Sequence, residues 1–123
     1  MKNVAVVGCT VTLSPGQGSK SITTQASAKV KADGKGIYFG PIDVSVSAYS
    51  DSIITVPSSG SGTITIRPTT QKVKVEGDYV ILEGDSGSAT ISGKAQVGQS
   101  QIDVTSNVTA KIEVAGQTKV KAN

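Results

Sequence analysis

The octapeptide SAKVKADG (Ser27–Gly34) returns in outline as TQKVKVEG (Thr70–Gly77) and as TAKIEVAG (Thr109–Gly116). Each copy starts with a hydroxyl residue and has a lysine at its third position, a β-branched residue at its fourth and a glycine at its eighth. These positions are Lys29, Val30, Gly34, Lys72, Val73, Gly77, Lys111, Ile112 and Gly116. The pattern predicts three short strands that each end in a tight turn, where glycine supplies a positive φ.

The chain after each copy has the composition of a returning strand, at residues 37–39, 79–82 and 119–122. Asp33-Gly34 is a strong signal for a two-residue hairpin turn, and Glu76-Gly77 and Ala115-Gly116 are weaker ones. We therefore expect three β-hairpins, with Val30 on the inward face of the first.

Apolar and polar residues alternate along the rest of the chain. In residues 42–49 the pattern places Ile42, Val44, Val46 and Ala48 on one face and puts Tyr49 on the polar face. No segment has helical periodicity with capping residues. The sequence predicts an all-β fold of about eight to ten strands in a single domain, residues 1–123.

Three units are too few for a propeller, and a solenoid would need capping repeats for which the chain has no room. The simplest arrangement left is a compact cone of three β-hairpin units with pseudo-threefold symmetry. Apolar residues make up 37% of the chain, and the aromatics are three tyrosines and one phenylalanine. A core built from so few large side chains favours a partner or self-association.

The net charge of +3 is a mild excess, and eleven of the twelve basic residues are lysines. A nucleic-acid-binding protein usually has a denser basic cluster, more arginine or exposed aromatics, so no nucleic-acid partner is expected. The apolar run near the N-terminus is too short for a signal peptide, and no segment is long enough to span a bilayer. We expect synthesis in the cytoplasm.

Catalytic chemistry has little support in the composition. The chain has no histidine and a single cysteine, which excludes Ser-His-Asp and Cys-His sites. A Ser-Lys or carboxylate-pair site stays open, although no residues are singled out for one. Cys9 lies in an apolar run and is expected to be a small buried hydrophobe. The prediction is a non-enzymatic protein with no cofactor.

The segment TTQKVKVEGDYVILEGDSGS (Thr69–Ser88) resembles the repeat of PAAR proteins. The matching positions in this copy are Lys72, Val73, Gly77, Val80, Gly84 and Asp85. The first copy keeps Lys29, Val30, Gly34, Ile37 and Gly40, with Pro41 where an aspartate would follow, and the third keeps Lys111, Ile112, Gly116 and Val120.

The resemblance implies a tip protein that docks as one copy on the end of a trimeric β-helical spike. Such tips belong to phage contractile tails, type VI secretion systems and related injection particles, and they contact a target membrane only while piercing it. The expected location is therefore a virion tail tip or injection particle. One chain with three similar units would cover the three strand edges at the end of such a spike.

Many PAAR proteins hold a metal ion through three histidines and a cysteine, a set that this chain lacks. Asp78, Glu83 and Asp85 are oxygen ligands suited to a hard cation, but the preferred interpretation is solvated turn carboxylates and no metal site. Two other functions stay open. One is a trimeric capsid decoration protein, and the other, less favoured, is a small β-sandwich adhesin.

Overall fold

The computed structural model describes residues 2–70 and 72–122 of the chain. It contains strands and no helices in this part of the chain. The strands are β1 (Lys2–Asn3), β2 (Thr10–Ser14), β3 (Gln17–Ile22), β4 (Lys31–Ala32), β5 (Lys35–Gly36), β6 (Ile42–Ser50), β7 (Gly60–Ile66), β8 (Lys74–Val75), β9 (Asp78–Tyr79), β10 (Ser86–Val97), β11 (Ser100–Val114) and β12 (Lys121–Ala122). The all-β prediction is confirmed.

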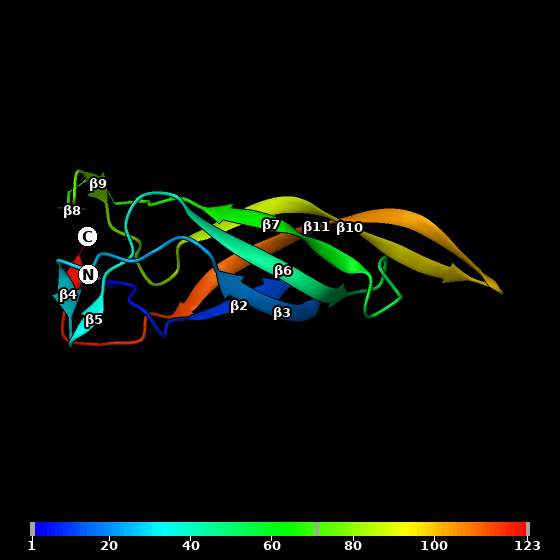
Figure 1. The fold of residues 1–123 in the computed structure, drawn as a ribbon, viewed down its shortest axis with the longest axis horizontal. Helices are drawn as coiled ribbons and strands as arrows, with labels where there is room; N and C mark the ends of the chain where they lie inside the picture. Colours follow the sequence, from blue (N-terminus) through cyan, green and yellow to red (C-terminus); the bar gives the residue numbers. More distant parts are fainter. Residues whose placement is uncertain (1, 71, 123) are drawn as a thin grey trace.

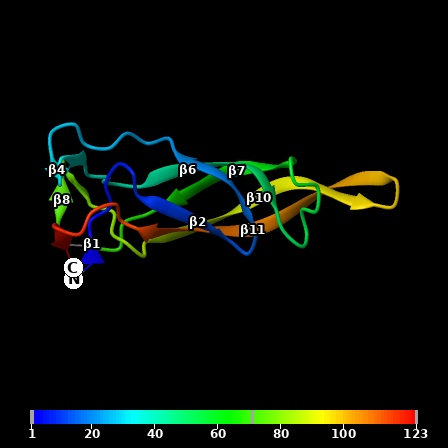
Figure 2. The same ribbon diagram turned by 90° about the horizontal axis from the view of Figure 1, so that it is seen from below.

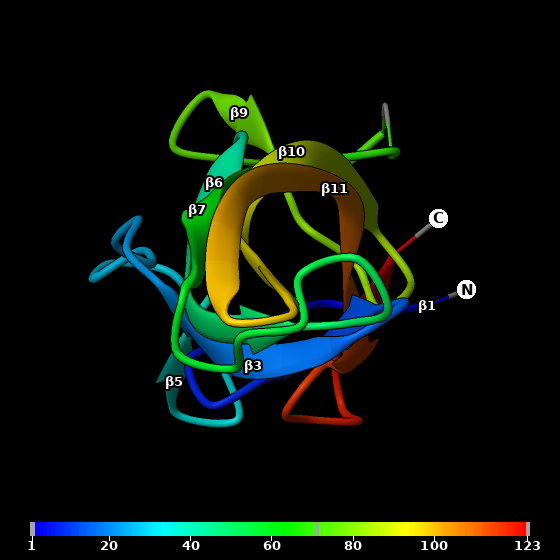
Figure 3. The same ribbon diagram turned by 90° about the vertical axis from the view of Figure 1, so that its right-hand side faces the viewer.

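Six strands form one nearly closed sheet in the order β2-β11-β10-β7-β6-β3. The two outer strands, β2 and β3, lie beside each other, so that the sheet curls around a common interior (Figure 3). Three consecutive strand pairs along the chain build this body, and each pair is hydrogen-bonded to the next through β3–β6, β7–β10 and β11–β2. The interior is filled by isoleucine and valine with Tyr49 and Tyr38.

Three small two-stranded units lie together at one end of the body (Figures 1 and 2). Two are the hairpins β4–β5 and β8–β9, and the third is the antiparallel pair β1–β12, whose strands come from opposite ends of the described chain. All three are called the small hairpins. The first two turn at Asp33-Gly34 and Glu76-Gly77, whose φ angles of 54°, 77°, 51° and 92° are all positive. Positive φ at both central residues is the geometry of a type I′ turn, which matches the twist of short hairpins. The predicted turns at Gly34 and Gly77 are therefore confirmed.

A cyclic set of backbone hydrogen bonds joins the small hairpins to the body. The Ala5 amide donates to the Ile81 carbonyl oxygen at 2.8 Å, Ile81 donates to Tyr38 at 3.0 Å, and Tyr38 donates to Ala5 at 3.1 Å. Their side chains enter the main core, whereas the residues on either side of each enter a second core under the hairpins. This second core consists of Val4, Ile37 and Val80, then Val6, Phe39 and Leu82, then Ala32, Val75 and Ala122.

The third predicted hairpin does not form. Lys111 and Ile112 lie inside β11, which runs unbroken from Ser100 to Val114, and Ile112 belongs to the main core. The predicted returning strand pairs instead with β1, in the register Lys121↔Asn3 and Ala122↔Lys2. The two ends of the described chain therefore complete the third small hairpin.

The expected compact cone is not confirmed. The molecule is elongated, and the outer part of the β10–β11 hairpin extends beyond the rest of the body at the end opposite the small hairpins (Figure 1). Within the described residues, the feature that recurs three times is a set of backbone pairings. Each repeat of that set comprises a small hairpin, a longer strand pair and one of three short extended segments joined by single β-bridges. These segments, residues 4–6, 37–39 and 80–82, carry the cyclic hydrogen bonds and are called the central strands.

A β-bulge in β6 overturns one predicted face. The ladder to β7 shifts between Val46 and Tyr49, and Ala48 has a φ of 52°. The extra residue reverses the alternation, so Ala48 is exposed and Tyr49 is fully buried, the opposite of the expected arrangement. The buried Tyr49 hydroxyl accepts a hydrogen bond from the Gly16 amide at 3.0 Å and donates one to Asp51 at 2.9 Å.

Replacing Ala48 by glycine is expected to stabilise the protein, because a residue with a Cβ pays about 1 kcal/mol or more at this φ. The greater freedom of glycine in the unfolded chain offsets part of that gain. We expect a rise in Tm of about 2 to 4 °C in thermal unfolding followed by circular dichroism. Ala28→Gly, at an exposed position whose φ is not positive, is the control and should lower Tm. A fall in Tm for Ala48→Gly would show that the bulge carries no strain.

Candidate interaction surface

One buried polar side chain stands at the start of each small hairpin: Ser27, Thr70 and Gln117, exposed by 3%, 4% and 6%. The Ser27 hydroxyl accepts hydrogen bonds from the backbone amides two and three residues later at 3.2 and 2.9 Å. The side-chain Oε1 of Gln117 accepts the equivalent two backbone amides at 2.7 and 2.8 Å. The Thr70 hydroxyl accepts the amide two residues later at 3.3 Å. Each contact holds the next residues in a turn. We call these the Lys-Val-Lys turns: Lys29–Lys31, Lys72–Lys74 and Lys119–Lys121.

The central valine of each turn is exposed. Val30, Val73 and Val120 expose 40%, 38% and 38% of their surface. The prediction of an inward-facing Val30 is wrong, because the inward position belongs to Ala32, two residues later and 1% exposed. The carbonyl of each valine accepts a backbone amide of the central strands at 3.0 to 3.2 Å, so the three residues hold equivalent places in the fold.

Positive charge is concentrated in the same region. The small hairpins and the Lys-Val-Lys turns carry eight of the twelve basic residues and three of the nine acidic ones. All six lysines of the turns are exposed, and within the described part of the chain only Lys119 forms an ion pair, with Asp33 at 3.0 Å. Lys74 lies over the Tyr79 ring, with its Nζ 4.8 Å from the centroid. Most of this charge is therefore directed at solvent.

Side-chain contacts hold neighbouring units together. The Ser27 hydroxyl donates to the Glu76 carboxylate in the turn of the second hairpin at 2.6 Å. Lys119 contacts Asp33 in the turn of the first hairpin through the ion pair, and Lys35 donates to the Gly116 carbonyl oxygen at 3.1 Å. These contacts join the first unit to the second and to the third.

Two of the three predicted repeat copies occupy equivalent places, and the third does not. Lys29, Val30, Lys72 and Val73 lie in Lys-Val-Lys turns, whereas Lys111 and Ile112 lie in the body and Gly116 follows β11 with a φ of 92°. The counterparts that the prediction missed are Gln117, Lys119 and Val120. A signal was present: KVKA at residues 119–122 is identical to residues 29–32. Because the pattern required a closing glycine, it selected a different segment.

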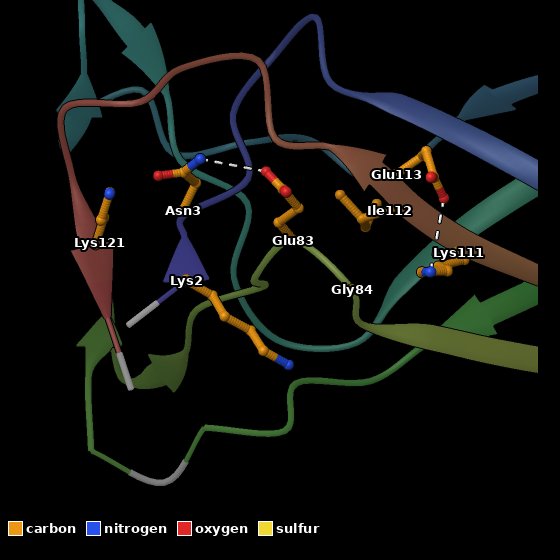
Figure 4. A pocket seen from close by; sticks show the side chains of 8 residues that line it. All are labelled: Lys2, Asn3, Glu83, Gly84, Lys111, Ile112, Glu113 and Lys121. Atoms are coloured by element: carbon orange, nitrogen blue, oxygen red, sulfur yellow. Dashed lines mark hydrogen bonds and ion pairs between the residues drawn. The ribbon is translucent and has the colours of Figure 1, made fainter.

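An open pocket of about 330 Å³ lies where the third small hairpin meets the body (Figure 4). Lys2, Lys111 and Lys121 line it together with Glu83 and Glu113. Glu113 pairs with Lys111 at 3.7 Å, and the Glu83 carboxylate accepts a hydrogen bond from the side-chain Nδ2 of Asn3 at 3.3 Å. Both carboxylates of the pocket therefore have partners within the protein. The other two lysines of the pocket, Lys2 and Lys121, add to the positive charge of this end.

The three carboxylates that the sequence offered as ligands for a hard cation, Asp78, Glu83 and Asp85, do not form a cluster. Asp85 is 1% exposed, and its side chain accepts hydrogen bonds from the Leu82 amide and the Thr69 hydroxyl. Among residues 2–70 and 72–122 no group of three His, Cys, Asp or Glu side chains is placed to hold a metal ion. In the same residues no helix is long and apolar enough to cross a membrane.

Cys9 is partly buried against the main core. Burial raises the pKa of its thiol to about 11, although a backbone hydrogen bond lowers it in part. A thiol with this pKa is protonated at neutral pH and is a poor nucleophile. This agrees with the interpretation of Cys9 as a packing residue.

Comparisons of the chain with protein-family models, with curated proteins and with solved structures find no match. The resemblance to PAAR proteins therefore depends on the repeat residues alone. The surface formed by the three Lys-Val-Lys turns is the strongest candidate for a functional site.

Proposed function

We propose that this protein is a non-enzymatic structural cap that docks as one copy on the end of a homotrimer. The partner we propose is the trimeric β-helical spike of a contractile tail or injection machine, where the cap helps to pierce the target envelope. The observation that carries the proposal is the cyclic set of hydrogen bonds through Ala5, Ile81 and Tyr38, with equivalent hairpins attached to each strand.

Symmetry provides the physical argument. A homotrimer ends in three identical surfaces around one axis, and an asymmetric monomer can engage only one of them at a time. A single chain that repeats one unit three times presents three related surfaces in a fixed arrangement. It can therefore contact all three subunits at once, and the second and third contacts are intramolecular.

The packing of the chain suits a mechanical role. Backbone hydrogen bonds connect all three units, and two apolar cores fill the body and the hairpin end. The body is elongated along the axis around which the three units are arranged (Figures 1 and 3). A nearly closed β body whose strand pairs are all hydrogen-bonded to one another can transmit an axial force without local unfolding.

Stoichiometry tests the proposal. The chain is mixed with its cognate trimeric spike, and the mass of the complex is measured by native mass spectrometry and by light scattering after size exclusion. We expect one chain per spike trimer and a monomeric isolated chain. Three chains per trimer, or no complex, would contradict the cap. A stable trimer of the isolated chain would instead favour the capsid decoration protein.

A further inference from the structure

We propose that the three Lys-Val-Lys turns form the docking face, and that they bind an acidic surface around the threefold axis of the partner. The proposal rests on the proposed function for the trimeric nature of that partner. It adds the end of the molecule that docks, the residues that make contact and the chemistry that they recognise.

The first argument is equivalence. Each Lys-Val-Lys turn is preceded by a buried polar residue that caps its amides, and each is followed by a small hairpin. Seen along the body, the three small hairpins project at three corners around the long axis (Figure 3). The chain therefore displays the same short surface three times in one orientation relative to that axis.

The second argument is the composition of the repeated surface. An exposed valine stands between two exposed lysines in all three turns. Single exposed apolar side chains are ordinary on protein surfaces; what distinguishes these three valines is that they occupy equivalent positions in three repeated units. An apolar contact ringed by charge is the general design of a protein interface, in which the centre excludes water and the rim selects the partner.

The third argument is charge complementarity. Lys29, Lys31, Lys72 and Lys121 make no ion pair in the described residues, although carboxylates of the hairpins lie in the same region. Carboxylates of a partner can supply the missing counterions at each corner. The partner surface that fits is thus a small apolar contact flanked by Asp or Glu, repeated in each of three subunits.

The same details favour a protein over a nucleic acid or a lipid surface. The face has no arginine and no exposed aromatic on which a base can stack. Its lysines are divided among three corners, and Asp33 and Glu76 contact Lys119 and Ser27 of the neighbouring units, which weakens the attraction of a continuous polyanion. Three separate basic corners on this protein fit three separate acidic patches, one on each subunit of a trimeric partner.

Charge reversal at the three corners tests the face. The variant combines Lys31→Glu, Lys74→Glu and Lys121→Glu, which occupy equivalent positions in β4, β8 and β12. We expect the Kd for the spike trimer, measured by biolayer interferometry, to rise about 100-fold or more because attraction at each corner becomes repulsion. The wild-type Kd should rise steeply between 50 and 500 mM NaCl, and that of the variant should not.

The matched control reverses three exposed charges on the body, with Lys20→Glu, Arg67→Glu and Lys94→Glu. It has the same net charge as the corner variant, so general electrostatic attraction changes equally in both. We expect the control to bind within about threefold of wild type, and both variants to keep the wild-type circular dichroism spectrum and Tm. Equal losses in the two variants, or no loss in the corner variant, would overturn the docking face.

The apolar contribution has its own pair of variants. Val30→Ser, Val73→Ser and Val120→Ser remove the three valines of the face, whereas Ile53→Ser, Val97→Ser and Ile102→Ser remove exposed apolar residues elsewhere. We expect faster dissociation and at least about a tenfold weaker Kd for the first set only. Similar binding of both sets would show that the valines make no contact.

Failure of this inference is distinguishable from failure of the cap. If wild type forms no one-to-one complex with the trimer, the proposed function itself is wrong. If wild type binds with that stoichiometry and the corner variant binds as well as the control, the cap stands and the docking face is elsewhere. Binding to duplex DNA or to vesicles with 25% phosphatidylserine, at the affinity of the spike and lost in the corner variant, would overturn the acidic protein partner.

Discussion

Gly87→Ala is expected to lower the free energy of unfolding by about 3 kcal/mol, among the largest effects of any single methyl group in this protein. A Cβ on Gly87 would lie 1.9 Å from the carbonyl oxygen of Thr65 and 2.8 Å from its carbonyl carbon. Both are backbone atoms, so no side-chain rotation can relieve the overlap. The end of β7 has to move away from β10, which disturbs the packing of the fully buried Ile66.

Urea unfolding monitored by circular dichroism measures this loss, and Ser86→Ala is the control. Ser86 is the exposed neighbour of Gly87 in β10, and its truncation should change the free energy of unfolding by no more than about 0.5 kcal/mol. A loss below about 1 kcal/mol for Gly87→Ala would mean that β7 and β10 are separable at this point. The contact joins the second strand pair to the third, so such a result would weaken the interpretation of a rigid body.

Asp51→Ala is expected to destabilise the protein by about 2 to 3 kcal/mol, because this carboxylate receives four hydrogen bonds. The amides of Ile53 and Ile54 donate to Oδ1, each at 2.7 Å. The hydroxyls of Tyr49 and Ser106 donate to Oδ2 at 2.9 and 2.6 Å. The alanine variant leaves these donors, two of them on buried side chains, without their acceptor.

The effect of Asp51 should depend on pH. Burial by itself raises the pKa of the carboxyl, but the hydrogen bonds from Ser106, Ile54, Ile53 and Tyr49 lower it by more, and the net direction is downward. A carboxyl whose pKa is lower in the folded state stabilises the fold above its unfolded pKa of about 3.9 and loses that contribution as pH falls through the folded value. The stability difference between wild type and Asp51→Asn should therefore narrow as pH falls from 5 to 2.

Asp103→Asn controls for the general effect of removing a carboxylate. Asp103 is exposed and pairs with Lys94 at 2.7 Å at the outer end of the β10–β11 hairpin. Its hydrogen bond and charge interaction with Lys94 lower its pKa, but water screens the pair, so we expect little change in Tm at any pH. A constant difference between wild type and Asp51→Asn across pH 5 to 2 would show that Asp51 does not titrate with the unfolding transition.

The sequence predicted local features well where one or two residues decide the backbone. Asp33-Gly34 and Glu76-Gly77 form the predicted turns. Asp-Gly adopts positive φ readily, whereas in the second turn glycine favours this geometry and Glu76 adopts it only in the context of the hairpin. Alternation placed Ile42, Val44 and Val46 correctly in the core. It failed at Ala48 and Tyr49, because a bulge inserts one residue in a ladder and no local signal marks its position.

The candidate surface was only partly predictable. The repeat pattern contained the residues of its first two corners, since each is contiguous in the chain, but it placed Val30 on an inward face and named no partner-binding residue. The third corner joins residues from both ends of the described chain, through β1 and β12, and a search for a closing glycine cannot find a hairpin whose strands are more than a hundred residues apart. The network around Asp51 was also missed, because its donors come from β6, from the following loop and from β11.

The sequence by itself determined that this chain is all-β and that at least two hairpins share one pattern, since strand alternation and turn geometry are set by neighbouring residues. Only the tertiary structure decided that the third hairpin is formed by β1 and β12, and that the three central strands close on one another through Ala5, Tyr38 and Ile81. The physical reason is that every strand edge presents the same backbone amides and carbonyls whatever its side chains are, so the sequence does not show which edges will pair. Which edges meet is decided by closure of the whole body and burial of its two cores.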